Sequence, residues 1–233
     1  MNLHFITSIS KEYWESTAKY CIGTWNLPGK LTVYVDQLMP GDLDWLAEIS
    51  HHKELLHVPP LNSVSEGFDR NKVLKFWGKS CAQLHAVRNR GVDERIIWID
   101  ADMEQLQPID VSLFDFDFTE PLAMMNSSYH EDCWETGLVI FNHTAEKIGV
   151  TLNRYEEAWN DKDILQNLWK PYDAPVLGYV AEQRGYKNLC NEPCVNLDSI
   201  NHSRYSGYFK HWINKTNKKL LSQKINEKNN NIS

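Results

Sequence analysis

The sequence of 233 residues has no surplus of basic residues. Its formal net charge is −7, and the last nineteen residues carry five Lys against one Glu, which leaves about −11 on the preceding part. A nucleic-acid-binding surface needs positive charge concentrated on one face. The charge balance therefore argues against nucleic acid as a partner.

The chain also lacks long apolar segments and paired cysteine motifs. No run approaches the eighteen apolar residues of a membrane span, and the first residues show no basic segment followed by a long apolar core. The cysteines are odd in number, scattered and without the C-x-x-C spacing of zinc sites: Cys21, Cys81, Cys133, Cys190 and Cys194. We expect free thiols, no membrane span and a cytoplasmic location.

What the sequence has is enough apolar material for a sizeable core. Hydrophobic residues make up 42% of the chain, and nine Trp, ten Tyr and eight Phe exceed what a minimal core needs, so some rings are expected to line a groove. No internal repeat and no linker divides the chain. We predict one domain over residues 1–214, followed by a Lys- and Asn-rich tail over 215–233 that is a frayed helix or disordered.

The most informative segment is RIIWIDADMEQLQPI, residues 95–109. Its apolar run over 96–99 predicts a strand buried on both faces, as in a parallel sheet covered by helices. Ligands of such sheets bind beyond the carboxyl ends of the strands. Because strand side chains alternate, we expect Asp100 and Asp102 to point the same way while Ala101 leaves room. Two carboxylates at one point favour Mg²⁺ or Mn²⁺, although Asp-x-Asp pairs are more often only solvated acids.

The first half of the chain predicts the neighbours of that strand. Residues 3–9 read as a strand, 11–22 as a helix with Ser10 as its N-cap, and 31–35 as a second strand ending at Asp36. This order is typical of an α/β fold with parallel pairing. Thr7, Ser8 and Asp36 would then share the sheet edge that carries Asp100, as nucleotide contacts or simply as turn formers.

The next predicted elements are a short helix over 42–50 and a long one over 71–90, with an apolar stripe for the core. Lys72, Lys75 and Lys79 recur on another face of the long helix. Such a stripe is usually only a solvated face. Because this helix leads directly into the aspartate strand, one of its lysines could instead reach a bound diphosphate.

The second half adds strands over 122–125 and 137–142, a mainly helical segment over 144–169, and a further helix after Pro175. The acids Asp132 and Glu135 precede the later strand, and Asp173 could cap the last helix or line the site. Residues 200–215 form a loop-like cluster rich in polar and aromatic residues, with two histidines, His202 and His211.

Three segments in order resemble the GT-A fold glycosyltransferases, and in particular the retaining family that includes glycogenin and lipopolysaccharide galactosyltransferases. They are KFWGKSCAQLHAVRNRGVDERIIWIDADMEQLQPI, ETGLVIFN and HSRYSGYFKHW. The last is similar to an H-x-x-G-x-x-K-P-W motif. It departs from that motif because His202 lies five residues before Gly207 and His211 stands in the place of the proline. Glu135 stands where the family usually has Asn.

The resemblance implies an α/β, Rossmann-like fold with a mostly parallel sheet, and a hexosyltransferase that uses a nucleotide-diphosphate sugar, with a UDP-sugar expected, and Mn²⁺ or Mg²⁺. It implies metal ligation by Asp100, Asp102 and His202, with His211 as the alternative histidine. The implied donor contacts are Thr7, Ser8, Asp36, Lys79, Asp100, Ala101, Gly207 and Lys210. The acceptor would be a carbohydrate or another hydroxyl compound.

The stereochemistry stays open, with a lean towards retention. An inverting enzyme needs a carboxylate base beside the acceptor hydroxyl, for which Asp132, Glu135 and Asp173 are candidates. A second hypothesis is a non-catalytic protein on the same fold that binds a nucleotide sugar or a glycan, motivated by the shifted His202 and by Glu135. A third, a dehalogenase-type phosphatase that uses Asp100 and Asp102, is disfavoured because that motif normally lies on the first strand.

Overall fold

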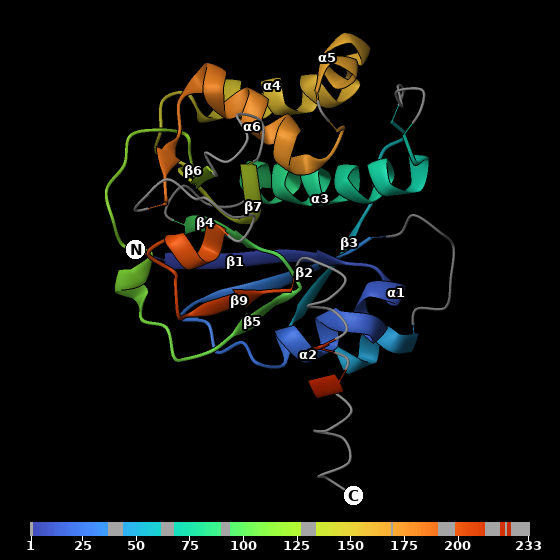
Figure 1. Cartoon of the computed structure of the whole chain (residues 1–233), viewed down its shortest axis with the longest axis vertical. Coiled ribbons are helices and arrows are strands. Elements are labelled where there is room, and N and C mark those ends of the chain that lie inside the picture. The colour runs from blue at the N-terminus through green and yellow to red at the C-terminus, as the bar shows by residue number, and fades with distance from the viewer. Residues whose placement is uncertain are drawn as a thin grey trace, which may run out of the picture.

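The computed structural model describes residues 2–36, 44–61, 68–89, 94–126, 134–168, 170–190, 199–212, 220–221 and 223–224. A sheet in the order β3-β2-β1-β4-β7-β6-β8 runs through the molecule (Figure 1). Its strands are β1 Asn2–Ile9, β2 Lys30–Asp36, β3 His52–Leu56, β4 Glu94–Ile99, β6 Leu122–Asn126, β7 Trp134–Phe141 and β8 Lys187–Asn188. Strands β1 to β4 are parallel, whereas β7 runs antiparallel to both β4 and β6. The predicted mostly parallel α/β sheet is confirmed.

Helices cover both faces of the sheet (Figure 1). On one face lie α3 Arg70–Asn89, α4 Ile148–Asn160, α5 Lys162–Asn167 and α6 Asp173–Arg184. On the other lie α1 Lys11–Tyr13 and α2 Lys19–Ile22, joined by a π-helical segment Trp14–Ala18, and a ribbon of β5 Met103–Gln105 with β9 Phe209–His211. Short 3-10 segments occur at Asp44–Glu48, Val111–Leu113 and Ser199–His202.

The β4 strand is buried from both sides, as its sequence predicts. Ile96 and Trp98 pack into the core under α3, α4 and α6, whereas Ile97 and Ile99 pack into the core on the opposite face. All four side chains are at most 1% exposed. The alternation of a strand thus divides one apolar run between two cores.

Several local expectations are confirmed. The Ser10 hydroxyl accepts a hydrogen bond from the Tyr13 backbone N–H at 3.3 Å, which is the predicted N-cap. The predicted strands over 3–9, 31–35 and 122–125 correspond to β1, β2 and β6. The long helix over 71–90 corresponds to α3, although the part beyond residue 89 lies outside the described residues.

Other expectations were wrong in their boundaries. The segment over 144–169 is mainly helical, as expected, but its first helix begins only at Ile148. The helix is interrupted at Asp161, whose carboxylate accepts from the N–H groups of Asp163 and Ile164 and starts α5. The final helix begins at Asp173, so Pro175 lies within its first turn, where a proline costs no hydrogen bond. The segment expected as a loop over 200–215 contains β9.

Strand β3 was not predicted, because its sequence HKELL carries two charges and no alternation of apolar residues. It forms the edge of the sheet beside β2, where exposed polar side chains are ordinary. Among the helices that the structure describes, none has an apolar stretch of the length that crosses a membrane.

A polar chain crosses the amino-terminal ends of three neighbouring strands. His4 Nδ1 lies 3.0 Å from Glu94 Oε2, its Nε2 lies 2.8 Å from Thr32 Oγ1, and the Lys30 ammonium donates to Glu94 Oε1 at 3.0 Å. The hydrogen bond with His4 lowers the pKa of Glu94, burial opposes this, and Lys30 lowers it further. The Glu94 carboxylate therefore stabilises the fold in its charged form.

Replacement of this acid, Glu94→Gln, is expected to lower the free energy of unfolding at pH 7 by about 1 kcal/mol. Because the folded pKa lies below the unfolded value, the contribution is complete above about pH 4.3 and is lost as the pH falls through the folded pKa. Urea unfolding of both proteins between pH 3 and pH 7 should show the difference shrinking towards low pH. The exposed Glu146→Gln variant is the control, and a difference independent of pH would contradict the assignment.

Candidate functional site

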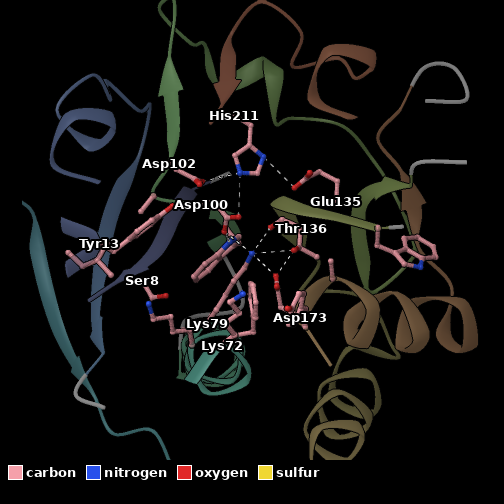
Figure 2. Close-up of a pocket in the computed structure, with 18 of the residues that line it drawn as sticks. Ser8, Tyr13, Lys72, Lys79, Asp100, Asp102, Glu135, Thr136, Asp173 and His211 are labelled. Atoms are coloured by element: carbon pink, nitrogen blue, oxygen red, sulfur yellow. Dashed lines mark hydrogen bonds and ion pairs between the residues drawn. The ribbon is translucent and has the colours of Figure 1, made fainter. Parts of the chain in front are cut away.

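A pocket of about 700 Å³ opens at the carboxyl ends of β1 and β4, beside α3 and the start of α6 (Figure 2). Its lining combines acids and lysines with aromatic rings. Seven residues that the sequence predicted for the site line it, together with the alternative histidine His211: Ser8, Lys79, Asp100, Ala101, Asp102, Glu135 and Asp173. This is the edge of an open parallel sheet at which ligands bind.

The two aspartates lie in a turn rather than in an extended strand. The Met103 N–H donates to the carbonyl of Asp100 at 3.0 Å, and the Asp100 N–H donates to the carbonyl of Gly137 at 2.8 Å. Strand alternation was therefore the wrong reason for expecting their carboxylates to converge. The turn directs both towards one point, and the Trp98 indole N–H fixes Asp100 by donating to its Oδ1 at 2.7 Å.

His211 meets the aspartates because β9 pairs with β5, the strand directly after them. Met103 and His211 are opposite each other in the ribbon, and the Trp212 N–H donates to the carbonyl of Asp102 at 3.2 Å. The Nε2 atom of His211 lies 3.0 Å from Asp102 Oδ1 and 3.7 Å from Asp100 Oδ2. One ligand atom from each of these three residues lies within 4.8 Å of the others, so the group could hold a metal ion.

Carboxylates govern the protonation of His211, which is buried. Burial alone would lower the pKa of the imidazole, but the charges of Asp102, Glu135 and Asp100 outweigh it and raise the pKa to about 10. Burial has the opposite effect on the acids and raises the pKa of Asp100 and of Glu135. Neighbouring charges therefore dominate the pKa of His211, whereas burial dominates the pKa values of the two acids.

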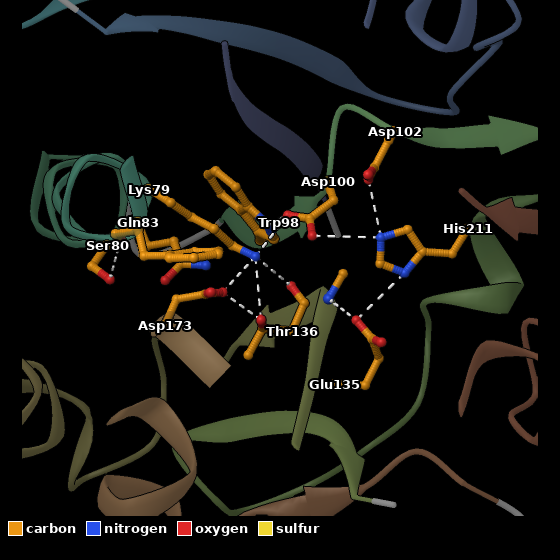
Figure 3. A network of polar contacts seen from close by, with 12 residues as sticks. Lys79, Ser80, Gln83, Trp98, Asp100, Asp102, Glu135, Thr136, Asp173 and His211 are labelled. Atoms are coloured by element: carbon orange, nitrogen blue, oxygen red, sulfur yellow. Dashed lines mark hydrogen bonds and ion pairs between the residues drawn. The ribbon is translucent and has the colours of Figure 1, made fainter. Parts of the chain in front are cut away.

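Lys79 forms a second centre of charge, on the side of Asp100 opposite His211 (Figure 3). Its ammonium lies 2.7 Å from Asp100 Oδ1 and 2.6 Å from Asp173 Oδ2, and it donates to the carbonyl and the hydroxyl of Thr136 at 3.2 Å. The Thr136 hydroxyl donates in turn to Asp173. Burial opposes the charge of Lys79, but Asp100 and Asp173 outweigh it and raise its pKa, so the ammonium stays charged.

Aromatic side chains supply much of the remaining lining. The rings of Phe76 and Tyr172 pack against each other, tilted by 32° with centroids 4.4 Å apart, and Trp134 lines the same pocket. Tyr13 lies beside the aspartates, where burial and a hydrogen bond to Asp102 raise its pKa well above the usual value. Sequence reasoning expected rings in a groove but did not identify these four. Only Tyr13 carried a signal, because it lies three residues after the predicted cap Ser10.

Comparisons with known proteins give fold-level matches. No family model matches the chain, and no curated protein sequence does. Among solved structures, the glycosyltransferase GlyE of Streptococcus pneumoniae TIGR4 is 13% identical with a TM-score of 0.53 over 81% of this chain and 45% of its own. The galactosyltransferase LgtC, in complex with donor and acceptor sugar analogs, is 11% identical with a TM-score of 0.54 over 91% and 87%.

A third structure, a glycosyltransferase involved in the glycosylation of the major capsid of PBCV-1, is 12% identical with a TM-score of 0.51 over 94% of this chain and 99% of its own. The chain has the GT-A fold. The resemblance to glycosyltransferases of this fold is confirmed at that level, since identities this low show the fold alone. The chain spans less than half the length of GlyE and of the bifunctional WbbM, which it also matches.

The histidine that lies beside the two aspartates is not the one that the sequence predicted as the third ligand in this GT-A fold. His202, the residue predicted as third ligand, lies in the 3-10 segment Ser199–His202 and does not line the pocket. The alternative, His211, belongs to the ligand-capable group of the described residues. The reason is the strand pairing of β9, which sequence spacing does not reveal.

Three other predicted donor contacts do not line the pocket as described: Thr7, Gly207 and Lys210. Thr7 is fully buried in β1, and Lys210 lies on β9 with its ammonium 4.0 Å from the centroid of the Trp212 ring. Gly207 has a φ of +81°, which favours glycine at a turn. Asp36 is the last residue of β2, and its side chain lies outside the described part of the structure. Asp132 lies outside the described residues altogether.

The Lys79 network leads to a stability prediction. Lys79→Met is expected to lower the free energy of unfolding by about 3–5 kcal/mol, because it leaves the buried carboxylates of Asp100 and Asp173 without this cation. Guanidinium unfolding in EDTA measures the loss. The double variant Lys79→Met with Asp173→Asn should recover part of it.

Lys75→Met is the matched control, since this exposed lysine of the same helix makes a surface ion pair with Glu12 at 3.5 Å. It should change stability by less than about 1 kcal/mol. Equal stabilities of the two single variants would contradict the role assigned to Lys79.

Proposed function

We propose that this protein is a metal-dependent glycosyltransferase that moves a sugar from a nucleotide-diphosphate sugar, a UDP-sugar, to a hydroxyl acceptor. The observation that carries the proposal is the convergence of Asp100, Asp102 and His211 in a pocket at the carboxyl ends of a GT-A sheet. The pocket volume of about 700 Å³ fits a small-molecule site.

The donor atoms suit a divalent cation of the Mn²⁺ or Mg²⁺ class. Two carboxylates supply hard oxygen ligands, and one imidazole supplies a nitrogen that Mn²⁺ accepts more readily than Mg²⁺ does. Three protein ligands leave coordination positions for phosphate oxygens and water. When bound, such a cation stabilises the negative charge that develops on the leaving nucleoside diphosphate.

The other residues of the pocket have separate tasks in this proposal. Lys79 places a positive charge between the carboxylates of Asp100 and Asp173 in a buried setting, and Thr136 fixes both Lys79 and Asp173 through its hydroxyl. The rings of Phe76 and Tyr172 offer an apolar surface of the kind on which sugars and bases stack. Together these groups would orient the donor and exclude water from the reacting bond.

Retention of the anomeric configuration fits the described carboxylates best. Asp173 is held by Lys79 and Thr136, and Glu135 accepts from the Gly137 N–H at 2.6 Å and faces His211. A general base for inversion would need a carboxylate ready to accept the acceptor's proton. Asp132 lies outside the described residues and stays a candidate for the base of an inverting reaction. NMR of the product anomer, compared with the donor, decides between the two outcomes.

The test of the activity is Asp102→Asn. Incubation of the purified chain with Mn²⁺ and a panel of nucleotide sugars and acceptors should give transfer or donor hydrolysis, and the variant is expected to lose at least about 100-fold of it because a charged ligand is gone. Asp117→Asn, which changes an exposed acid outside the pocket lining, should keep full activity.

Full activity of Asp102→Asn would contradict the metal assignment. Saturable donor binding by the wild-type chain without turnover across the acceptor panel would instead favour the non-catalytic nucleotide-sugar-binding or glycan-binding alternative. Circular dichroism of each variant confirms that the fold is intact.

A further inference from the structure

The two ring nitrogens of His211 face different carboxylates (Figure 3). Nε2 faces the aspartates, 3.0 Å from Asp102 Oδ1 and 3.7 Å from Asp100 Oδ2. Nδ1, on the other side of the ring, lies 3.5 Å from Glu135 Oε1. The ring is therefore placed between the aspartate pair and Glu135.

Glu135 is itself held in place by the strand that carries it. Its Oε1 accepts a hydrogen bond from the Gly137 backbone N–H at 2.6 Å, and its side chain is only 13% exposed. The same Gly137 accepts from the Asp100 N–H through its carbonyl, at 2.8 Å. One residue of β7 thus fixes both the carboxylate on one side of the imidazole and the turn on the other side.

Gly137 is also the residue that lets His211 and Glu135 meet. A Cβ atom at this position would lie 2.6 Å from Cε1 and 2.9 Å from Nδ1 of His211, and 2.9 Å from Oε1 of Glu135. Contacts this short do not occur between real side chains, so any larger residue would push the ring and the carboxylate apart. The sequence Glu-Thr-Gly at 135–137 is therefore fitted to this arrangement.

A bound cation takes the place of one proton of His211, so the chemical consequence concerns which nitrogen of the then neutral imidazole keeps its proton. A proton on Nδ1 points to Glu135 and leaves the lone pair of Nε2 facing the aspartates, where a cation would bind. The opposite tautomer would direct the Nδ1 lone pair at a carboxylate. A carboxylate behind a ligating histidine selects the tautomer, orients the ring and makes its other nitrogen a better ligand.

We propose that Glu135 is a positioning residue of the cation site, which acts through His211, rather than the base of the transfer reaction or a ligand itself. The inference rests on the proposed function insofar as that function requires a cation at Asp100, Asp102 and His211. Glu135 does not belong to that ligand-capable group of the described residues, because it approaches the ring from the other nitrogen.

Calorimetric titration of the full chain with Mn²⁺ alone tests this role without any activity measurement. Glu135→Leu removes the acceptor and is expected to weaken Mn²⁺ binding by about 10–100-fold. Glu135→Gln keeps an oxygen that can accept from Nδ1 and from Gly137 but removes the charge, so its loss should be smaller. The exposed acid Glu146, changed to Gln, is the control and should leave the affinity unaltered.

The tautomer of His211 provides a readout that a merely structural role would not move. With Mg²⁺ as the diamagnetic cation, ¹⁵N NMR of the wild-type chain should show His211 protonated on Nδ1, with His211→Gln assigning the signals. Glu135→Leu should shift the population towards the Nε2-protonated form, and Glu135→Gln should restore the wild-type tautomer in part.

The outcomes separate this inference from the proposed function. Absence of Mn²⁺ binding in the wild type would overturn the metal site and the role of Glu135 with it. Wild-type affinity in Glu135→Leu would overturn the positioning role alone. Equal losses in both Glu135 variants, with an unchanged tautomer, would identify Glu135 as a direct ligand and likewise overturn it. If Glu135→Leu does not fold, a wild-type Mn²⁺ affinity in Glu135→Gln would overturn the positioning role in its place.

Discussion

The pairing of β5 with β9 is the constraint on which the site depends. It joins the strand that follows Asp102 to a strand more than a hundred residues later, and it places Met103 opposite His211. The ribbon is fixed from behind, because the Trp25 indole N–H donates to the carbonyl of Met103 at 2.6 Å and Leu221 is buried against Trp212. Without this pairing the aspartates would be a charged turn with no third ligand.

Four acids, Asp100, Asp102, Glu135 and Asp173, gather around Lys79 and His211 in the buried part of the pocket. The other lysines of its lining, Lys72, Lys75 and Lys170, are exposed or half-buried. Carboxylates in such a setting must be paired, because unpaired buried charge is costly. The ammonium of Lys79 pairs with Asp100 and Asp173, and His211 together with a divalent cation would balance Asp100, Asp102 and Glu135. Because unpaired buried carboxylates would destabilise the fold, their presence here favours a bound cation.

Prediction from sequence succeeded where the signal was local. The apolar run at 96–99 indicated a strand buried on two faces, and Ser10 indicated a helix start, because both depend on neighbours along the chain. It failed where a distant partner decides the structure. Strand β3 depends on β2 for its pairing, and β9 depends on β5, so their short polar sequences carried no strand pattern. The turn at Asp100 likewise depends on Gly137, which no local pattern shows.

By itself the sequence determined the α/β class, the sheet edge at which a ligand would bind, and the acids Asp100 and Asp102 at that edge, since hydrophobic periodicity and strand ends are properties of contiguous residues. Tertiary structure alone decided that His211 and not His202 joins the aspartates, and that Lys79 is enclosed by Asp100 and Asp173. These contacts join residues from the turn after β4 and from β9, α3 and α6. Only the packing of those elements sets the few ångströms on which coordination and charge pairing depend.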